Sequence, residues 1–182
     1  ENRFYYDFDV EVPFTEKDLK MIEDKMRELA SQKQEITRLE ITRDEAIDIF
    51  QKMDEPYKVE IISEIDPKDN ISIYRQNSFI DLCRGPHVPN TGMIKHFRLL
   101  ESSSAYWRGD ENNKVLQRIY GTAFHSKKEL KSYLHLREEA KKRDHRKLGK
   151  ELNLYTFDDE VGPGLPLWLP KGTILVEELE KL

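Results

Sequence analysis

The only cysteine of the chain, Cys83, is followed four positions later by His87. Thiolate sulfur and imidazole nitrogen both bind zinc, and the intervening Gly85-Pro86 favours a turn that would bring the two side chains together. Two ligands are too few, because zinc takes four protein ligands, or three and a water. None of the other histidines, at positions 96, 125, 135 and 145, has a histidine partner three or four positions away. The spacing alone therefore leaves a site and a plain loop histidine beside a buried cysteine as equal alternatives, and it predicts no complete zinc site.

Composition favours a soluble cytoplasmic protein. The 182 residues, 37% of them hydrophobic, suffice for one full domain and part of a second. No apolar run approaches the roughly 20 residues of a membrane-spanning helix, and the N-terminus has neither the basic start nor the apolar core of a signal peptide. A single cysteine cannot form an internal disulfide, which agrees with a reducing compartment. We therefore expect the cytosol and no membrane partner.

The net charge of −5 conceals a strong segregation of charge along the chain. Residues 1–82 carry 12 Lys/Arg against 21 Asp/Glu, whereas residues 83–151 carry 16 against 8. A basic segment next to an acidic one suggests that one surface meets a polyanion. A solvated charged helix explains the same pattern equally well.

The N-terminal third of the chain predicts alternating strands and helices. The aromatic and β-branched run Phe4–Val10 is typical of a strand, and Thr15 is a helix cap followed by apolar residues at helical spacing. Ile36–Ile41 predicts a second strand, and the capping box Thr42–Glu45 opens a second helix. The segment Tyr57–Ile65 fits a strand or a helix, and its position after a proline favours the helix.

The middle of the chain predicts antiparallel strands. Three apolar runs separated by turn residues are expected to be strands: Ile71–Tyr74, Phe79–Cys83 and Phe97–Leu100. Two further extended segments, 105–108 and 115–124, flank a loop at 109–114 with the composition of a hairpin. Helices followed by an antiparallel meander predict an α+β domain, in which helices pack on an antiparallel sheet.

A long charged helix is expected after this domain. Ser126–Glu129 is a capping box, and nothing breaks the helix until about Gly149 or Leu152. Few apolar residues follow Arg137, so the second half of the helix is expected to leave the core and form a linker over residues 126–152. The remainder, 153–182, holds a Gly/Pro-punctuated apolar stretch and a helix from Lys171 to the end, which suggests the start of a second, truncated domain.

Six strings, in this order, resemble the threonyl-tRNA synthetase family: Phe4–Asp7, Asp81–Pro89, Ala105–Asp110, Leu116–Phe124, Lys142–Lys150 and Gly162–Pro166. The resemblance covers essentially the whole chain and is far more specific than the Cys-His spacing. Two places depart from the family pattern: Arg3 stands where glycine is usual, and Ser103-Ser104 replaces the common Ala-Gly. Neither departure touches a candidate site residue.

The resemblance implies a fold and an activity. Residues 1–125 would be the editing domain, of the second additional type shared by threonyl- and alanyl-tRNA synthetases, without its N-terminal part. A charged linker helix would follow at 126–152, and the start of the class II catalytic domain at 153–182. The family attaches threonine to its tRNA using ATP and hydrolyses mischarged seryl-tRNA in the editing domain. Because serine lacks one methyl group of threonine, binding alone discriminates by only about 1 to 3 kcal/mol, and a second site is needed.

Residue-by-residue matching to the family implies a catalytic set in the editing domain: Lys58, Asp81, Cys83 and His87. Lys58 would position or activate the hydrolytic water or stabilise the developing oxyanion, and Asp81 would accept hydrogen bonds from the seryl group. Cys83 and His87 would be half of a constellation whose other half is an H-x-x-x-H helix that this chain lacks. They could hold a metal only together with those histidines, so no metal is expected for this chain.

Seven basic residues are implied as tRNA contacts: Arg108, Arg118, Lys141, Lys142, Arg143, Arg146 and Lys147. The first two lie on the predicted hairpin and could contact the acceptor arm, or pair instead with nearby carboxylates. The other five would line one broad face of the linker helix and neutralise phosphates.

The family also implies ATP, magnesium, zinc and a homodimer for the full-length protein, with the zinc ligands beyond Leu182. The chain by itself would take no cofactor and would not ligate. Two alternatives are a free-standing aminoacyl-tRNA deacylase and a non-catalytic tRNA-binding module.

Overall fold

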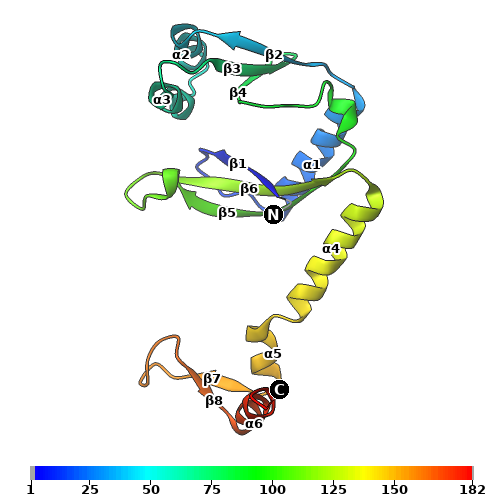
Figure 1. The fold of residues 1–182 in the computed structure, drawn as a ribbon, viewed down its shortest axis with the longest axis vertical. Helices are drawn as coiled ribbons and strands as arrows, with labels where there is room; N and C mark the ends of the chain where they lie inside the picture. Colours follow the sequence, from blue (N-terminus) through cyan, green and yellow to red (C-terminus); the bar gives the residue numbers. More distant parts are fainter. Residues whose placement is uncertain (1–2, 182) are drawn as a thin grey trace. The chain divides into compact units, whose positions relative to one another are not determined.

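The computed structural model describes residues 3–181, and the chain divides into two compact units, Glu1–Ser126 and Lys127–Leu182 (Figure 1). The first unit contains nine main elements: β1 (Phe4–Phe8), α1 (Glu16–Ser31), β2 (Ile36–Ile41), α2 (Arg43–Lys52), α3 (Pro56–Glu64), β3 (Ile71–Gln76), β4 (Phe79–Leu82), β5 (His96–Tyr106) and β6 (Val115–Phe124). Two short 3-10 turns, Thr91–Met93 and Trp107–Gly109, interrupt the loops.

The strands of the first unit form two antiparallel sheets, with the orders β1-β6-β5 and β2-β3-β4. The α+β class and the antiparallel pairing are therefore confirmed. The prediction of one continuous meander is wrong, because β3 and β4 pair with β2, whereas β5 and β6 pair with β1. Strand β1 pairs with β6, in which Arg118 lies opposite Asp7 although the two residues are 111 positions apart. No local sequence pattern predicts pairing over such a distance.

The helix starts predicted from the Thr15 cap and from the Thr42–Glu45 capping box are confirmed, and both form capping boxes in the structure. Thr15 accepts a hydrogen bond from the backbone of Asp18, and Thr42 accepts one from the backbone of Glu45, with each acidic side chain bonding back to the cap. Pro56 occupies the first turn of α3, where its missing N–H costs nothing.

Helices α2 and α3 cover one face of the β2-β3-β4 sheet (Figure 1). The core between them contains Ala46, Phe50, Ile62, Ile71 and Ile73. Side chains alternate along a strand, so Ser72, which lies between Ile71 and Ile73 in β3, points to the opposite face of the sheet. The candidate site lies on that face.

The second unit contains α4 (Lys127–Lys142), α5 (His145–Glu151), β7 (Tyr155–Phe157), β8 (Pro166–Trp168) and α6 (Pro170–Leu179). The prediction of an unbroken helix over 126–152 is wrong. The helix ends at Lys142, and Asp144 caps a new one, because its carboxylate accepts a hydrogen bond from the backbone N–H of Arg146 at 2.8 Å. Within residues 3–181, no helix has the length and apolar character to cross a membrane.

Candidate active site

Lys58 and Asp81 form an ion pair that is largely shielded from solvent. Lys58 lies in the first turn of α3, and its Nζ is 3.1 Å from Oδ1 of Asp81 and 3.4 Å from Oε1 of Glu55. The side chain of Lys58 is only 13% exposed and that of Asp81 20%. Ile80 and Leu82, the neighbours of Asp81 in β4, pack against the core, so Asp81 lies on the opposite face of the strand, where the side chain of Lys58 reaches it.

A third group joins this pair from the other sheet. The hydroxyl of Tyr6, on β1, donates a hydrogen bond to Oδ2 of Asp81 at 3.0 Å. Sequence reasoning missed Tyr6. The available signal was the alternation in β1, which puts Tyr6 on the same face as the partly buried Phe8 and away from the face of Asp7.

The electrostatics of the cluster keep Lys58 charged. Burial disfavours its ammonium, but the charge of Asp81, with Tyr6 and Glu55, outweighs this, and the pKa of Lys58 is raised above its usual value. Burial and the neighbouring Asp81 carboxylate also raise the pKa of Tyr6. At neutral pH the cluster therefore presents an ammonium and a neutral phenol around one carboxylate.

Cys83 and His87 lie in contact, across the turn that Gly85-Pro86 allows. Nε2 of His87 lies 3.1 Å from Sγ of Cys83, which also accepts a hydrogen bond from the backbone N–H of Gly85 at 3.3 Å. The imidazole stacks on the ring of Tyr74 with 3.9 Å between centroids. Gly85 makes this packing possible: its φ is +76°, and a Cβ there would lie 1.8 Å from the Tyr74 hydroxyl.

The two pairs share one face of the sheet. Cys83 continues the ladder of β4 through a hydrogen bond from its N–H to the carbonyl of Ser72 at 3.2 Å, and it follows Asp81 by two positions. Side chains two apart on an extended chain point the same way. The site thus combines a charged pair with a thiol and an imidazole.

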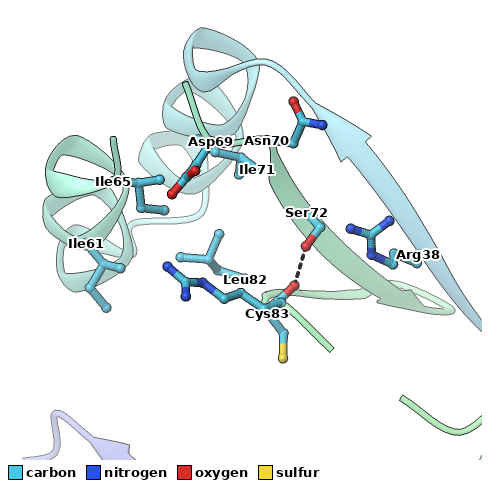
Figure 2. A pocket seen from close by; sticks show the side chains of 10 residues that line it. Arg38, Ile61, Ile65, Asp69, Asn70, Ile71, Ser72, Leu82 and Cys83 are labelled. Carbon is cyan, nitrogen blue, oxygen red and sulfur yellow. Dashed lines mark hydrogen bonds between the residues drawn. The ribbon is translucent and has the colours of Figure 1, made fainter. Parts of the chain in front are cut away.

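A pocket of about 520 Å³ opens beside Cys83 at the start of β3 (Figure 2). Ile61 of α3 and Ile65, which directly follows α3, line one side, and Arg38 of β2 lines another. The Cys83 carbonyl accepts a hydrogen bond from the Ser72 hydroxyl at 2.6 Å. Lys58 and Asp81 do not line it. The pocket and the ion pair therefore adjoin the same strand end without coinciding.

The donors present do not fit a metal ion. Cys83 and His87 supply two ligands, and no cluster of three or more His, Cys, Asp or Glu side chains with metal-binding geometry occurs in residues 3–181. Asp81 is already engaged by Lys58 and Tyr6. Two donors fall short of the three or four that zinc takes from a protein.

The two hairpin arginines are both paired with carboxylates, the alternative that the sequence left open. Arg108 lies 2.8 Å from Glu60 and 2.6 Å from Glu64. Arg118 makes two hydrogen bonds to Asp7, at 2.6 and 2.8 Å, and lies over the ring of Tyr5. Hydrogen bonds to Glu64 and to Asp7 raise the pKa of the respective guanidinium.

The five basic residues of the second unit do not share one helix. Lys141 and Lys142 end α4, Arg143 lies in the break, and Arg146 and Lys147 belong to α5. Their side chains are 55–78% exposed, and each lies within 4 Å of a nearby acidic group. Exposed pairs of this kind are weak, so the cations are available to a polyanion.

Comparison with known proteins identifies both the domain type and the relatives. Residues 71–120 match the family model described as "Threonyl and Alanyl tRNA synthetase second additional domain". Threonine–tRNA ligases from Pelobacter propionicus, Citrifermentans bemidjiense and Anoxybacillus flavithermus are 55%, 57% and 53% identical to the chain over 180, 180 and 181 residues. The alignments cover 99–100% of the chain, which spans about 28% of the length of these curated relatives.

Proposed function

The chain belongs to the threonine–tRNA ligase family, and from this premise we propose that the protein containing it attaches threonine to tRNA with ATP and removes serine attached in error. The present segment would perform the second reaction, hydrolysis of seryl-tRNA. The observation that carries the proposal is the shielded Lys58–Asp81 pair with Tyr6 at its carboxylate, on a domain of the editing type.

The chemistry of the pair suits hydrolysis of an aminoacyl ester. Attack of water on the ester carbonyl develops a negative charge on oxygen, and a fixed ammonium such as that of Lys58 stabilises it. Because the pKa of Lys58 is raised, the amine is protonated at neutral pH and acts by its charge rather than as a general base. Asp81 would accept hydrogen bonds from the hydroxyl or ammonium group of the seryl moiety.

Selection against threonine needs a steric contribution. Threonine carries the same hydroxyl and amino groups as serine, so hydrogen bonds to Asp81 cannot tell the two apart. The additional methyl group is the only difference, and a closely packed site rejects it by lack of room. We propose that His87 and Cys83, held by Tyr74, form part of this boundary.

The remaining assignments follow from the family. We propose that α4 and α5 carry a tRNA-contacting surface made of Lys141, Lys142, Arg143, Arg146 and Lys147, and that residues 153–182 begin the class II catalytic domain. ATP, magnesium and zinc would serve that domain, and the full-length protein would be a homodimer. That Arg118 contacts the acceptor arm stays a prediction. The same prediction for Arg108 competes with its pairing to Glu60 and Glu64.

The proposal is tested in the full-length protein supplied with serine, ATP and the threonine-specific tRNA. Lys58→Met and Asp81→Asn should accumulate seryl-tRNA, whereas the wild-type protein should not. Threonine attachment should be unchanged in both variants. Lys52→Gln, which removes an exposed ion pair with Asp48 on the neighbouring helix, is the control and should behave as wild type. Equal, low levels of seryl-tRNA in all four proteins would contradict an editing role for the pair.

A further inference from the structure

Residues at the tip of the β5–β6 hairpin contact helix α3 through hydrogen bonds and ion pairs. The indole N–H of Trp107 lies 3.2 Å from both carboxylate oxygens of Glu60, and Nε of Arg108 is 2.8 Å from the same carboxylate. Nη1 of Arg108 reaches Glu64 at 2.6 Å. Two successive residues in the turn that follows β5 thus bind two carboxylates on a helix that packs on the other sheet.

A second contact fixes the beginning of the same helix. The ring of Tyr57 lies 4.8 Å from the ring of Trp107, and its hydroxyl donates to Asp9 at 2.7 Å. Lys114, at the exit of the hairpin, pairs with the same Asp9 oxygen at 2.7 Å. Burial and the hydrogen bond to Asp9 raise the pKa of Tyr57 to about 12, so the hydroxyl remains a donor throughout the physiological range.

These contacts define one face of α3. Tyr57, Glu60 and Glu64 follow each other at helical spacings of three and four, which puts them on a common stripe. Lys58 is the next residue after Tyr57 and points instead to Asp81. A helix of nine residues without a side-chain N-cap has little stability of its own, so outside contacts determine its rotation.

The backbone of the hairpin tip is itself unusual. Arg108 has φ 57° and ψ 15°, a left-handed conformation that is unfavourable for a residue other than glycine. The surrounding turn compensates: the Asn113 side chain donates to the Trp107 carbonyl at 3.2 Å, and Trp107 N–H donates to the Lys114 carbonyl at 2.9 Å. The left-handed backbone of Arg108 directs its guanidinium toward Glu60 and Glu64 of α3.

We propose that Trp107 and Arg108 are positioning residues for Lys58: by fixing the rotation of α3, they hold the ammonium against Asp81. This inference rests on the proposed editing function for its catalytic consequence. It assigns the Arg108 guanidinium to Glu60 and Glu64, in place of the acceptor arm of tRNA.

The test compares Arg108→Gln, Glu64→Gln and the double variant in the full-length protein, by single-turnover hydrolysis of preformed seryl-tRNA. Each single variant should lower the maximal rate about tenfold, because small displacements of a catalytic group are costly. The double variant should be no slower than either single one, and the half-saturating protein concentration should stay within about twofold. Arg108→Lys should recover part of the rate, since it keeps one charge but loses the second hydrogen bond. Lys52→Gln is the matched control, and thermal unfolding shows whether each variant folds.

Two results would overturn the inference while the editing function stands. Unchanged rates in the Arg108 and Glu64 variants of an active protein would show that the contacts of the hairpin tip with α3 do not position Lys58. A higher half-saturating concentration with Arg108→Gln but not with Glu64→Gln would make Arg108 a tRNA contact instead. If the wild-type protein does not hydrolyse seryl-tRNA, the editing proposal fails. NMR of the Lys58 ammonium still tests whether the hairpin tip positions Lys58. Its signal, assigned with Lys58→Met, should broaden by faster exchange with water in Arg108→Gln and not in Lys52→Gln; an unchanged signal would refute the positioning role.

Discussion

The ammonium of Lys58 lies 3.1 Å from one carboxylate oxygen of Asp81, while the hydroxyl of Tyr6 donates to the other oxygen at 3.0 Å. Three elements meet at this carboxylate: α3, β4 and, from the second sheet, β1. Solvent reaches this ion pair only in small part, because the side chains of Lys58 and Asp81 are 13% and 20% exposed, so the loss of either partner leaves the other poorly compensated.

Breaking the pair should therefore destabilise the first unit. We expect Lys58→Met to lower the free energy of unfolding by about 1 to 3 kcal/mol, because it leaves the Asp81 carboxylate shielded without its cation. The double variant Lys58→Met/Asp81→Asn should cost less than the sum of the single changes. Urea unfolding followed by circular dichroism measures both quantities. Strict additivity would show that the two charges do not interact.

The contribution of this pair to stability should disappear at high pH. The pKa of Lys58 is raised in the folded state above its ordinary value of 10.5, so the folded protein binds the proton more tightly than the unfolded chain. The stabilisation is then complete below about pH 9 and is lost as the pH rises through the folded-state pKa. The difference in unfolding free energy between the wild type and Lys58→Met should be constant from pH 7 to about pH 9 and shrink above it. The variant Tyr6→Phe measures the separate contribution of the Tyr6 phenol. Its pKa is also raised in the folded state, so this contribution to stability is likewise lost at high pH. A difference that grows with pH would contradict the raised pKa of Lys58.

Gly85 should be the least replaceable residue of the Cys83–His87 loop. Gly85→Ala would put a methyl group against the Tyr74 hydroxyl at a positive φ. We expect it to lower stability by about 1 to 3 kcal/mol and to separate Cys83 from His87. Tyr74→Phe removes the closest atom, so Gly85→Ala should cost less in that background, although the ring carbon 2.7 Å away keeps part of the clash. An equal cost in both backgrounds would exclude the contact as the cause.

The basic surface of the second unit should bind RNA through phosphates. Replacing Lys141, Lys142 and Lys147 together by glutamine should weaken tRNA binding regardless of tRNA sequence. The slope of log Kd against log salt concentration should fall by roughly 0.7 to 0.9 for each phosphate that the variant no longer neutralises. Titration at several salt concentrations measures this slope, with Lys52→Gln as the control. A weaker affinity for the cognate tRNA alone would point to base recognition instead.

Local sequence signals predicted the features that depend on neighbouring residues. The cap at Thr15 and the capping box at Thr42 predicted two helix starts, and Gly85-Pro86 allowed the turn in which Cys83 contacts His87. Features that depend on distant pairing were not predictable in this way. The two-sheet arrangement, and with it the approach of Tyr6 to Asp81 across 75 positions, arises from strand pairing that no local pattern specifies.

The break between α4 and α5 is an intermediate case. Asp144 is a residue type that favours helix caps, but it lies in a charged run of good helix formers, and the pattern favoured continuity. The structure ends the helix there because the Asp144 side chain bonds the backbone and the guanidinium of Arg146. These hydrogen bonds hold the pKa of Asp144 well below its usual range.

The most direct measurement is single-turnover hydrolysis of preformed seryl-tRNA by the full-length protein, with threonyl-tRNA of the same tRNA as the competing substrate. Release of serine much faster than threonine, lost in Lys58→Met and kept in Lys52→Gln, is the predicted result. Equal rates for the two esters, or undiminished serine release without Lys58, would contradict the assignment of editing to this cluster.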